Sequence, residues 1–384
     1  MKRKPLLLII LMIISLIPYK SYAKNSNYIS WEIAVDKMDR TNTSLLNMAD
    51  SELMAKRQYE AALISKTIDT DGISLSIMGQ GYFIEYDSSV KLYMTLRKEL
   101  YPEQMKYSWE TAKDNREMTR NSMIISLRGL YLGLYTSSND LKLKQKKYEL
   151  AQAIHKQNTI KSEKGMITDV ELEESQYDLL TAKTAVKTAE RNLENALCSF
   201  NAFIGEDFDK RYDKIIYNEK YDTSRLKNLD YYSSKALVKR MEVVSLKKQI
   251  KLMELNKDII ERIPYCLNSS DIKKNYDELT EDIEYEKIKL KQAQIEVERN
   301  INEAYLDVEE AEKNLISLGK ILDLQKSNLI KLKKQYEKGL VSKVSVDQAQ
   351  LTFEELENNY NAALYDYNTK IMKLEYAAGI GPAY

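Results

Sequence analysis

The chain has 384 residues with 58 basic and 58 acidic side chains, and this zero net charge argues against nucleic acid as a partner. It holds only 11 glycines and 5 prolines. No proline lies between Pro102 and Pro264, which favours long helices because an interior proline costs roughly 3 kcal/mol. Two cysteines and a single histidine, His155, argue against a disulfide framework, a metal cluster and most catalytic constellations, so we expect no metal and no cofactor.

The amino terminus has the features of an export signal. Lys2, Arg3 and Lys4 precede an apolar run over residues 6–17, and Ser21-Tyr22-Ala23 offers small residues where a signal peptidase cleaves. Twelve apolar residues are few for crossing a bilayer, although a retained membrane anchor is the alternative. We therefore predict a signal peptide over residues 1–23 and a mature chain outside the cytoplasmic membrane.

The first half begins with helical periodicity and then changes period. Residues 30–67 predict a helix with a break around 40–43, and its counterpart in the second half spans about 232–261. Residues 73–77 and 90–96 then alternate with period two, which predicts one short β-hairpin over about 72–97. The second half has only a loop over 262–270 at this place.

Two very long helices follow, one in each half. The pattern predicts them over about residues 102–163 and 270–337, with a seam of period near 3.5 that favours left-handed coiling. Gly129 and Gly133 form a GxxxG pair, which predicts the close approach of a neighbouring helix. A mixed stretch over 203–229 links the halves.

The two halves repeat one pattern. A glycine turn follows each long helix, at Gly165 in the first half and at Gly339 in the second. The returning helices carry seams from Leu172 to Phe203 and, at the same interval along the sequence, from Val346 to Ala377. An internal repeat of this length indicates a duplicated unit.

We therefore predict a mainly α fold of long antiparallel coiled-coil hairpins in two tandem repeats, with one short β-hairpin. The predicted boundaries are 24–205 for the first repeat, 206–229 for the linker and 230–384 for the second repeat.

This arrangement resembles the TolC-like outer membrane efflux family over about residues 29–381. The second repeat carries the closer match, in these residues: Tyr336-Glu337-Lys338-Gly339-Leu340-Val341-Ser342, Val346, Ala349, Gln350, Asn359-Tyr360-Asn361-Ala362-Ala363, Leu374, Ala378 and Gly379.

The resemblance implies a homotrimer whose hairpins form one hollow helical cylinder, with strands closing a barrel in an outer membrane. It also implies a periplasmic adaptor at the hairpin tips and an inner-membrane transporter behind it. The adaptor-contact residues would be Gly165, Met166, Ile167, Thr168, Gly339, Leu340, Val341 and Ser342. The four apolar residues of this set, Met166, Ile167, Leu340 and Val341, would then be exposed at the tips. From the residues alone, each glycine turn is equally well explained as a plain helix cap with a hydrophobic contact.

The sequence departs from the family at both ends. One hairpin per chain gives a trimer six strands, too few for an open pore, so we expect the hairpin to cap or dock on the cylinder. At the tips, Ser345 and Gln348 stand where the best-known members have aspartates. Tyr336 is retained with Asp347 beside Gln348, and these two residues are the candidates for a tip aperture.

We predict an exit duct of a tripartite efflux pump or type I secretion system, located in the outer membrane or cell envelope. The alternative is an exported coiled-coil scaffold or adaptor that has lost the pore. An enzyme is the least favoured interpretation, because acidic pairs such as Glu173-Glu174 diverge around a helix and are solvated.

Overall fold

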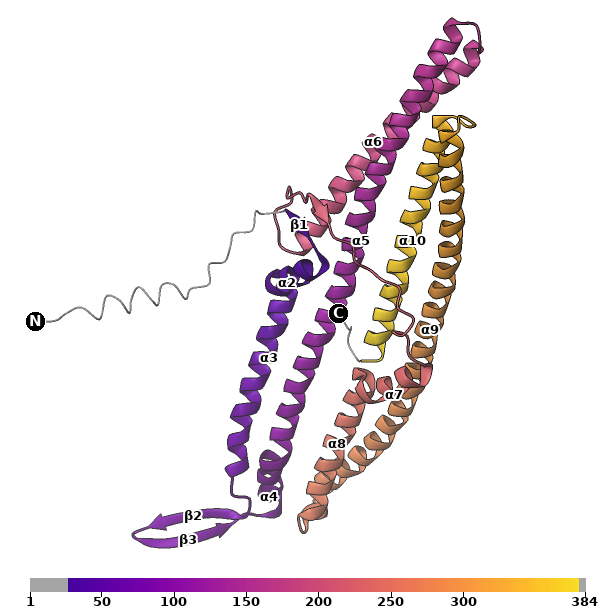
Figure 1. The fold of residues 1–384 in the computed structure, drawn as a ribbon. Coiled ribbons are helices and arrows are strands. Elements are labelled where there is room, and N and C mark those ends of the chain that lie inside the picture. Colours follow the sequence, from indigo (N-terminus) through magenta and orange to yellow (C-terminus); the bar gives the residue numbers. More distant parts are fainter. Residues whose placement is uncertain (1–26, 380–384) are drawn as a thin grey trace, which may run out of the picture.

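The computed structural model describes residues 27–379, so the predicted signal peptide lies outside the described residues. Two long helical hairpins dominate the molecule (Figure 1). The first joins α5 (Tyr101–Glu163) to α6 (Asp169–Phe203), and the second joins α9 (Ser270–Glu337) to α10 (Lys343–Ala377). Both turns lie at the same end of the molecule. The predicted long helices are confirmed, and α5 alone is about 95 Å long at 1.5 Å per residue.

Shorter helices continue the layer at the opposite end. In the first half, α2 (Trp31–Thr41) and α3 (Thr43–Ala62) lead into a short 3₁₀ turn, η1 (Leu63–Thr67). Asn42 separates the two helices and caps the second one by accepting from the amide of Leu45 (3.3 Å), so the predicted break is confirmed. In the second half, α7 (Leu229–Lys239) and α8 (Met241–Arg262) break in the same way at Arg240, which adopts an extended conformation.

The long helices form one layer. Helix α5 packs against α6 on one side and α10 on the other, while α10 also packs against α9. Figure 1 shows the resulting order α6, α5, α10, α9. Helices α3 and α8 cover the lower parts of α5 and α9. Helices α6 and α9 are therefore the two outer edges of the layer.

The two halves have equivalent cores. Each core is a cluster of buried apolar side chains on the long helix, the returning helix and the first short helices. In the two long helical hairpins, six pairs of buried apolar residues keep the sequence interval that separates the two turn glycines: Leu127 and Ile301, Leu134 and Val308, Ala189 and Ala363, Leu197 and Ile371, Phe200 and Leu374, Ile204 and Ala378. The same interval thus carries the same packing in both halves, which supports the proposed duplication.

The linker between the halves lies beside the helices. β4 (Lys214–Ile215) pairs in parallel with β1 (Tyr28–Ile29), so the linker is held against the start of the first half. The Tyr217 hydroxyl donates to the backbone carbonyl of Asn361 at 2.7 Å and connects the linker to α10.

The predicted β-hairpin exists, but the prediction for its second strand is wrong. β2 (Gly72–Ile77) pairs antiparallel with β3 (Gln80–Glu85) through a two-residue turn, Met78 and Gly79, in which both residues have positive φ. Residues 90–96 are helical instead, in α4 (Ser88–Thr95) and the π turn η2 (Leu96–Leu100).

The reason for this error lies in local capping and packing. The side chain of Asp87 accepts from the amide of Val90 at 2.9 Å and starts α4. Leu92 and Leu100 then pack on α8 residues such as Ile259. The corresponding place in the second half holds only a short 3₁₀ turn, η3 (Cys266–Asn268), as the predicted loop implied.

A second expectation also fails within the chain. The GxxxG pair was expected to mark the close approach of a neighbouring helix. No atom outside the local helix backbone lies within 4 Å of the Cβ position at either Gly129 or Gly133.

A buried guanidinium joins the two halves. Arg128 of α5 has a side chain that is 5% exposed, and it pairs with Glu219 of the linker at 2.8 Å. Its Nε donates to the Thr369 hydroxyl of α10 at 2.8 Å, and its guanidinium lies 4.2 Å from the ring centroid of Tyr365. Glu219 also accepts from the Asn368 amide at 2.6 Å. One charged side chain thus holds α5, the linker and α10 together.

Replacing Glu219 with alanine should lower the free energy of unfolding by roughly 2–4 kcal/mol, because Arg128 would remain buried without its counter-ion. Glu194→Ala is the control: it removes the exposed pair with Arg211 (2.6 Å) and should cost under about 1 kcal/mol. Urea unfolding followed by circular dichroism measures both. Equal small effects would contradict a central role for Arg128.

Candidate functional site: the hairpin tips and the helix edges

Both hairpin turns are built from the same backbone hydrogen bonds. Gly165 and Gly339 have φ of 68° and 73°, which a residue without Cβ adopts at little cost. In the first turn the amide of Gly165 donates to the carbonyl of Ser162 (2.8 Å), and the amide of Met166 donates to Lys161 (2.9 Å). The second turn repeats both bonds, from Gly339 to Tyr336 and from Leu340 to Gln335, at 2.8 and 2.9 Å. These bonds satisfy carbonyls at the helix end, so the glycine reverses the chain without exposing an unpaired backbone.

The returning helices start with different caps. In the first tip, Thr168 and Glu171 form a reciprocal capping box, in which the Glu171 carboxylate accepts from the amide of Thr168 at 2.8 Å. This bond lowers the pKa of Glu171. In the second tip, Ser342 caps α10 by accepting from the amide of Ser345 at 3.2 Å, and no carboxylate takes part.

The tips consequently differ in charge. Asp169 opens α6, whereas Lys343 opens α10 at the equivalent position. An acidic group near a helix N-terminus is stabilising and a lysine is not, so the second tip carries a positive charge without a local structural benefit.

The predicted apolar tip residues divide into two kinds. Met166 and Leu340 are 68% and 70% exposed. Ile167 and Val341, which were also expected to be exposed, are half-buried. Each tip therefore presents one apolar side chain beside an exposed glycine, and nothing lies within 4 Å of the Cβ position at either glycine.

The two residues suggested for a tip aperture lie on different helices of the second hairpin. Tyr336 is in the last turn of α9 and is 45% exposed, and Asp347 is half-buried in the second turn of α10. No aperture forms within one chain at this place, since a single hairpin encloses no opening.

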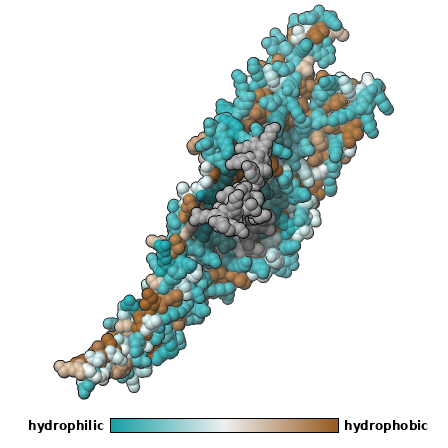
Figure 2. Space-filling model, turned by 60° about the vertical axis from the view of Figure 1, so that its left-hand side comes forward, coloured by the Kyte–Doolittle hydropathy of each residue, from teal (hydrophilic) through white to brown (hydrophobic). Residues whose placement is uncertain are grey.

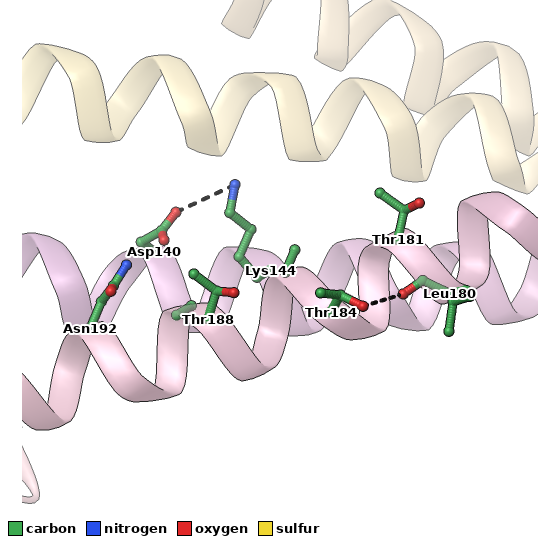
Figure 3. A pocket seen from close by; sticks show the side chains of 9 residues that line it. Asp140, Lys144, Leu180, Thr181, Thr184, Thr188 and Asn192 are labelled. Atoms are coloured by element: carbon green, nitrogen blue, oxygen red, sulfur yellow. Dashed lines mark hydrogen bonds and ion pairs between the residues drawn. The ribbon is translucent and has the colours of Figure 1, made fainter.

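A shallow hollow lies on one face of the α5–α6 hairpin (Figure 3). Its volume is about 560 Å³. An ion pair between Asp140 and Lys144 (3.7 Å) borders it, and the Thr184 hydroxyl donates to the carbonyl of Leu180 at 3.0 Å. Its lining residues are Asp140, Lys144, Leu180, Thr181, Thr184, Ala185, Thr188, Ala189 and Asn192. Short side chains along a helix pair leave a groove into which a ridge of side chains from another helix can pack.

The outer edges of the layer carry exposed apolar side chains. On α6 these are Val170, Tyr177 and Leu180. On α9 they are Tyr285, Ile288, Ile295, Leu306, Ile316, Ile321, Leu324 and Ile330. Figure 2 shows such hydrophobic side chains interspersed among hydrophilic ones over one face of the molecule. An apolar row on both free edges indicates that each edge is suited to pack against another helix.

The sequence pattern did not reveal these edges, because the exposed residues lie outside the heptad seam that the periodicity followed. Tyr177 and Leu180, on the helix face opposite to much of the seam, were the available signal.

The single histidine takes part in a structural contact. His155 Nδ1 lies 2.9 Å from the Ser175 hydroxyl, in the seam of the first hairpin. The equivalent residues of the second repeat are Leu329 and Ala349, which are both buried. The two polar residues that interrupt the apolar seam of the first hairpin, His155 and Ser175, thus contact each other.

Over residues 27–379 no group of three or more histidine, cysteine, aspartate or glutamate side chains is arranged to hold a metal ion. Nor does any helix of this range combine the length and apolar character needed to cross a membrane.

Comparison with solved structures gives the fold. The chain is similar to the CmeC outer membrane channel of Campylobacter jejuni, with a TM-score of 0.62, 14% identity, and coverage of 91% of this chain and 86% of that chain. It is similar to the MtrE outer membrane channel of Neisseria gonorrhoeae, solved in its open state, with a TM-score of 0.58, 14% identity and coverage of 91% and 89%. It is also similar to the outer membrane protein VceC of Vibrio cholerae, with a TM-score of 0.60, 8% identity, and coverage of 91% of this chain and 96% of that chain.

No protein-family model and no curated protein sequence matches the chain. The structural neighbours nevertheless confirm the predicted fold class: the chain has the TolC-like helical fold, as outer membrane channels do.

The tip conformation can be tested at Gly339. Gly339→Val should destabilise the second hairpin turn by about 1–2 kcal/mol or more, because a β-branched residue is strained at positive φ. Gly339→Asn is the matched control, since asparagine tolerates this region, and it should retain most of the stability. Amide hydrogen exchange over residues 335–346 reads the local effect. Equal exchange in the two variants would show that the turn does not depend on φ.

Proposed function

We propose that three copies of this chain form a helical conduit of the cell envelope, through which substrates leave as in an efflux pump or type I secretion system. The observation that carries the proposal is the layer α6, α5, α10, α9, whose free edges are both apolar. The fold likeness to outer membrane channels supports the same conclusion. The same likeness supports the proposal that the protein is exported and lies in the outer membrane or cell envelope.

Ring closure follows from the geometry of the edges. Because α6 and α9 differ in sequence and lie on opposite edges, the natural contact joins α6 of one copy to α9 of the next. Such a heterologous contact generates a closed ring when the rotation between copies is right. The hollow beside α6, lined by Thr184, Ala185 and Thr188, lies next to this edge and can receive side chains from the neighbouring copy.

The tips are the proposed contacts for an adaptor protein, which would connect the conduit to an inner-membrane transporter. They are exposed, lie at one end of the molecule and carry one projecting apolar side chain each, Met166 and Leu340. The exposed glycines allow a partner's backbone to approach closely.

A second candidate function is an exported scaffold with the same helical body and no membrane pore. The short hairpin favours it: each strand has six residues, whereas a strand that spans a bilayer has roughly nine to eleven. The two functions share the ring and the tips and differ in what crosses the membrane.

The ring predicts a defined oligomer. Purified protein in mild detergent should sediment as a trimer, and Leu324→Asp combined with Ile295→Asp should shift it to the monomer, because charged groups would enter the α9 edge. Lys326→Asp, two residues along and therefore on the other side of α9, should leave the trimer intact. A monodisperse wild-type monomer would contradict the conduit.

The adaptor contact predicts a separable loss of binding. The double variant Met166→Asp, Leu340→Asp should keep the trimer mass and the melting temperature, because both side chains are exposed. It should abolish cross-linking to an adaptor in the envelope, identified by mass spectrometry. Phe208→Asp, an exposed aromatic far from the tips, is the control and should retain the adaptor. Unfolding of the double variant would instead show that the tips are structural caps.

A further inference from the structure

The β-hairpin has one apolar face. Its register pairs Ile73 with Ile84 and Leu75 with Tyr82, and opposed residues lie on the same side of a two-stranded sheet. With Ile77, these side chains form one row, and each of them is 36–54% exposed. The opposite face holds Ser74, Ser76, Gly81 and Phe83. The hairpin is therefore amphipathic, with its apolar face uncovered.

The same segment lacks charge. No charged residue occurs between Asp71 and Glu85, although 30% of the chain is charged. Charge begins at the base of the hairpin, where Lys91 pairs with Asp71 at 2.6 Å. The boundary between uncharged strands and charged base matches the boundary between hydrocarbon and headgroups in a bilayer.

Residues 27–379 do not cover the hairpin. Every residue of β2 and β3 except Gly72 is exposed, and Met78 at the turn is completely exposed. Figure 1 shows the strands projecting from the helices. Within one copy the hairpin does not pack on the helices, and its docking on a cylinder of three copies stays a prediction. Tyr265, which is 80% exposed, adds an aromatic side chain from the second half to the same end, because the carbonyl of the preceding Pro264 accepts from the Ser88 hydroxyl at 3.0 Å.

Length and backbone bonding limit how deep the hairpin can go. Six residues at about 3.3 Å reach about 20 Å, which exceeds one leaflet of about 15 Å but is less than the hydrocarbon thickness of about 30 Å. The outer edges of a two-stranded sheet also carry unpaired N–H and C=O groups, which are costly in the bilayer centre.

We propose that the hairpin inserts its apolar face into the near leaflet of a lipid bilayer and anchors this end of the molecule there. The apolar face and the turn residue Met78 enter the acyl region, while the Asp71–Lys91 pair at the base lies toward the headgroups. Three hairpins in a trimer would act together and strengthen the attachment. The anchor does not depend on transport and would serve a pore-free scaffold equally well.

Vesicle flotation with the full-length protein tests this anchor. Phosphatidylcholine vesicles are the probe. Because they carry no net charge, binding to them measures the apolar contribution only. Leu75→Asp combined with Ile84→Asp should lower the vesicle-bound to free ratio at least tenfold. Ser74→Asp combined with Ser76→Asp adds the same charge to the opposite face and should lower the ratio less than threefold. Circular dichroism and trimer mass should be unchanged in both, since all four side chains are exposed.

Four results would overturn the proposal. The first is a wild-type protein that does not float with the vesicles. The second is an equal loss of vesicle binding in the two variants. The third is a set of hairpins that cross-link to one another in solution while the protein does not bind vesicles. The fourth is large, steady conductance in planar bilayers that disappears on deleting residues 72–85, which would show strands that span the bilayer. The trimer mass tests the proposed conduit independently of vesicle binding, so the conduit and the membrane anchor can each be contradicted without the other.

Discussion

Each hairpin of this protein buries one apolar seam, and a helix pair that buries one seam leaves its outer faces without a partner. Two such hairpins in contact through α5 and α10 bury one more face and still leave α6 and α9 as free edges. These edges carry exposed apolar residues such as Tyr177 and Leu324. The fold is thus complete within one chain, and the proposed ring of three copies would cover both free edges.

The two repeats share their cores and differ at their ends. In each repeat, the glycine that follows the returning helix lies against the end of the repeat's first short helix. A Cβ on Gly205 would lie 2.6 Å from Thr41 at the end of α2, and one on Gly379 would lie 2.8 Å from Lys239 at the end of α7. Arg128 and Glu219 then fix the repeats to each other through a contact without a counterpart in the repeat pattern. The two repeats differ mainly at the tips and at the hairpin end, which are the proposed contacts with an adaptor and with a membrane.

Most of the fold could be predicted because local rules determine it. Absence of proline, a sustained heptad and a glycine at each reversal predicted the long helices, and these predictions are confirmed within a few residues. Residues 90–96 show the limit of period-two reasoning: their alternation is compatible with a strand, but the Asp87 cap and the burial of Leu92 make them a helix. The turn at Met78-Gly79 was the stronger hairpin signal.

Tertiary features were less accessible. The sequence does not show that Arg128 is buried, because its partners Glu219 and Thr369 lie far along the chain. The GxxxG pair suggested a close helix contact that this chain does not make. At the tips, the sequence identified Met166 and Leu340 as exposed, but it could not separate them from the half-buried Ile167 and Val341.

Electron cryo-microscopy of the purified protein, viewed along the helix axes, would show whether three copies form the proposed ring. We expect a hollow ring with three-fold symmetry in which each copy contributes the four helices α6, α5, α10 and α9 to the wall. Single flat layers of four helices, or a closed bundle without a central space, would contradict it.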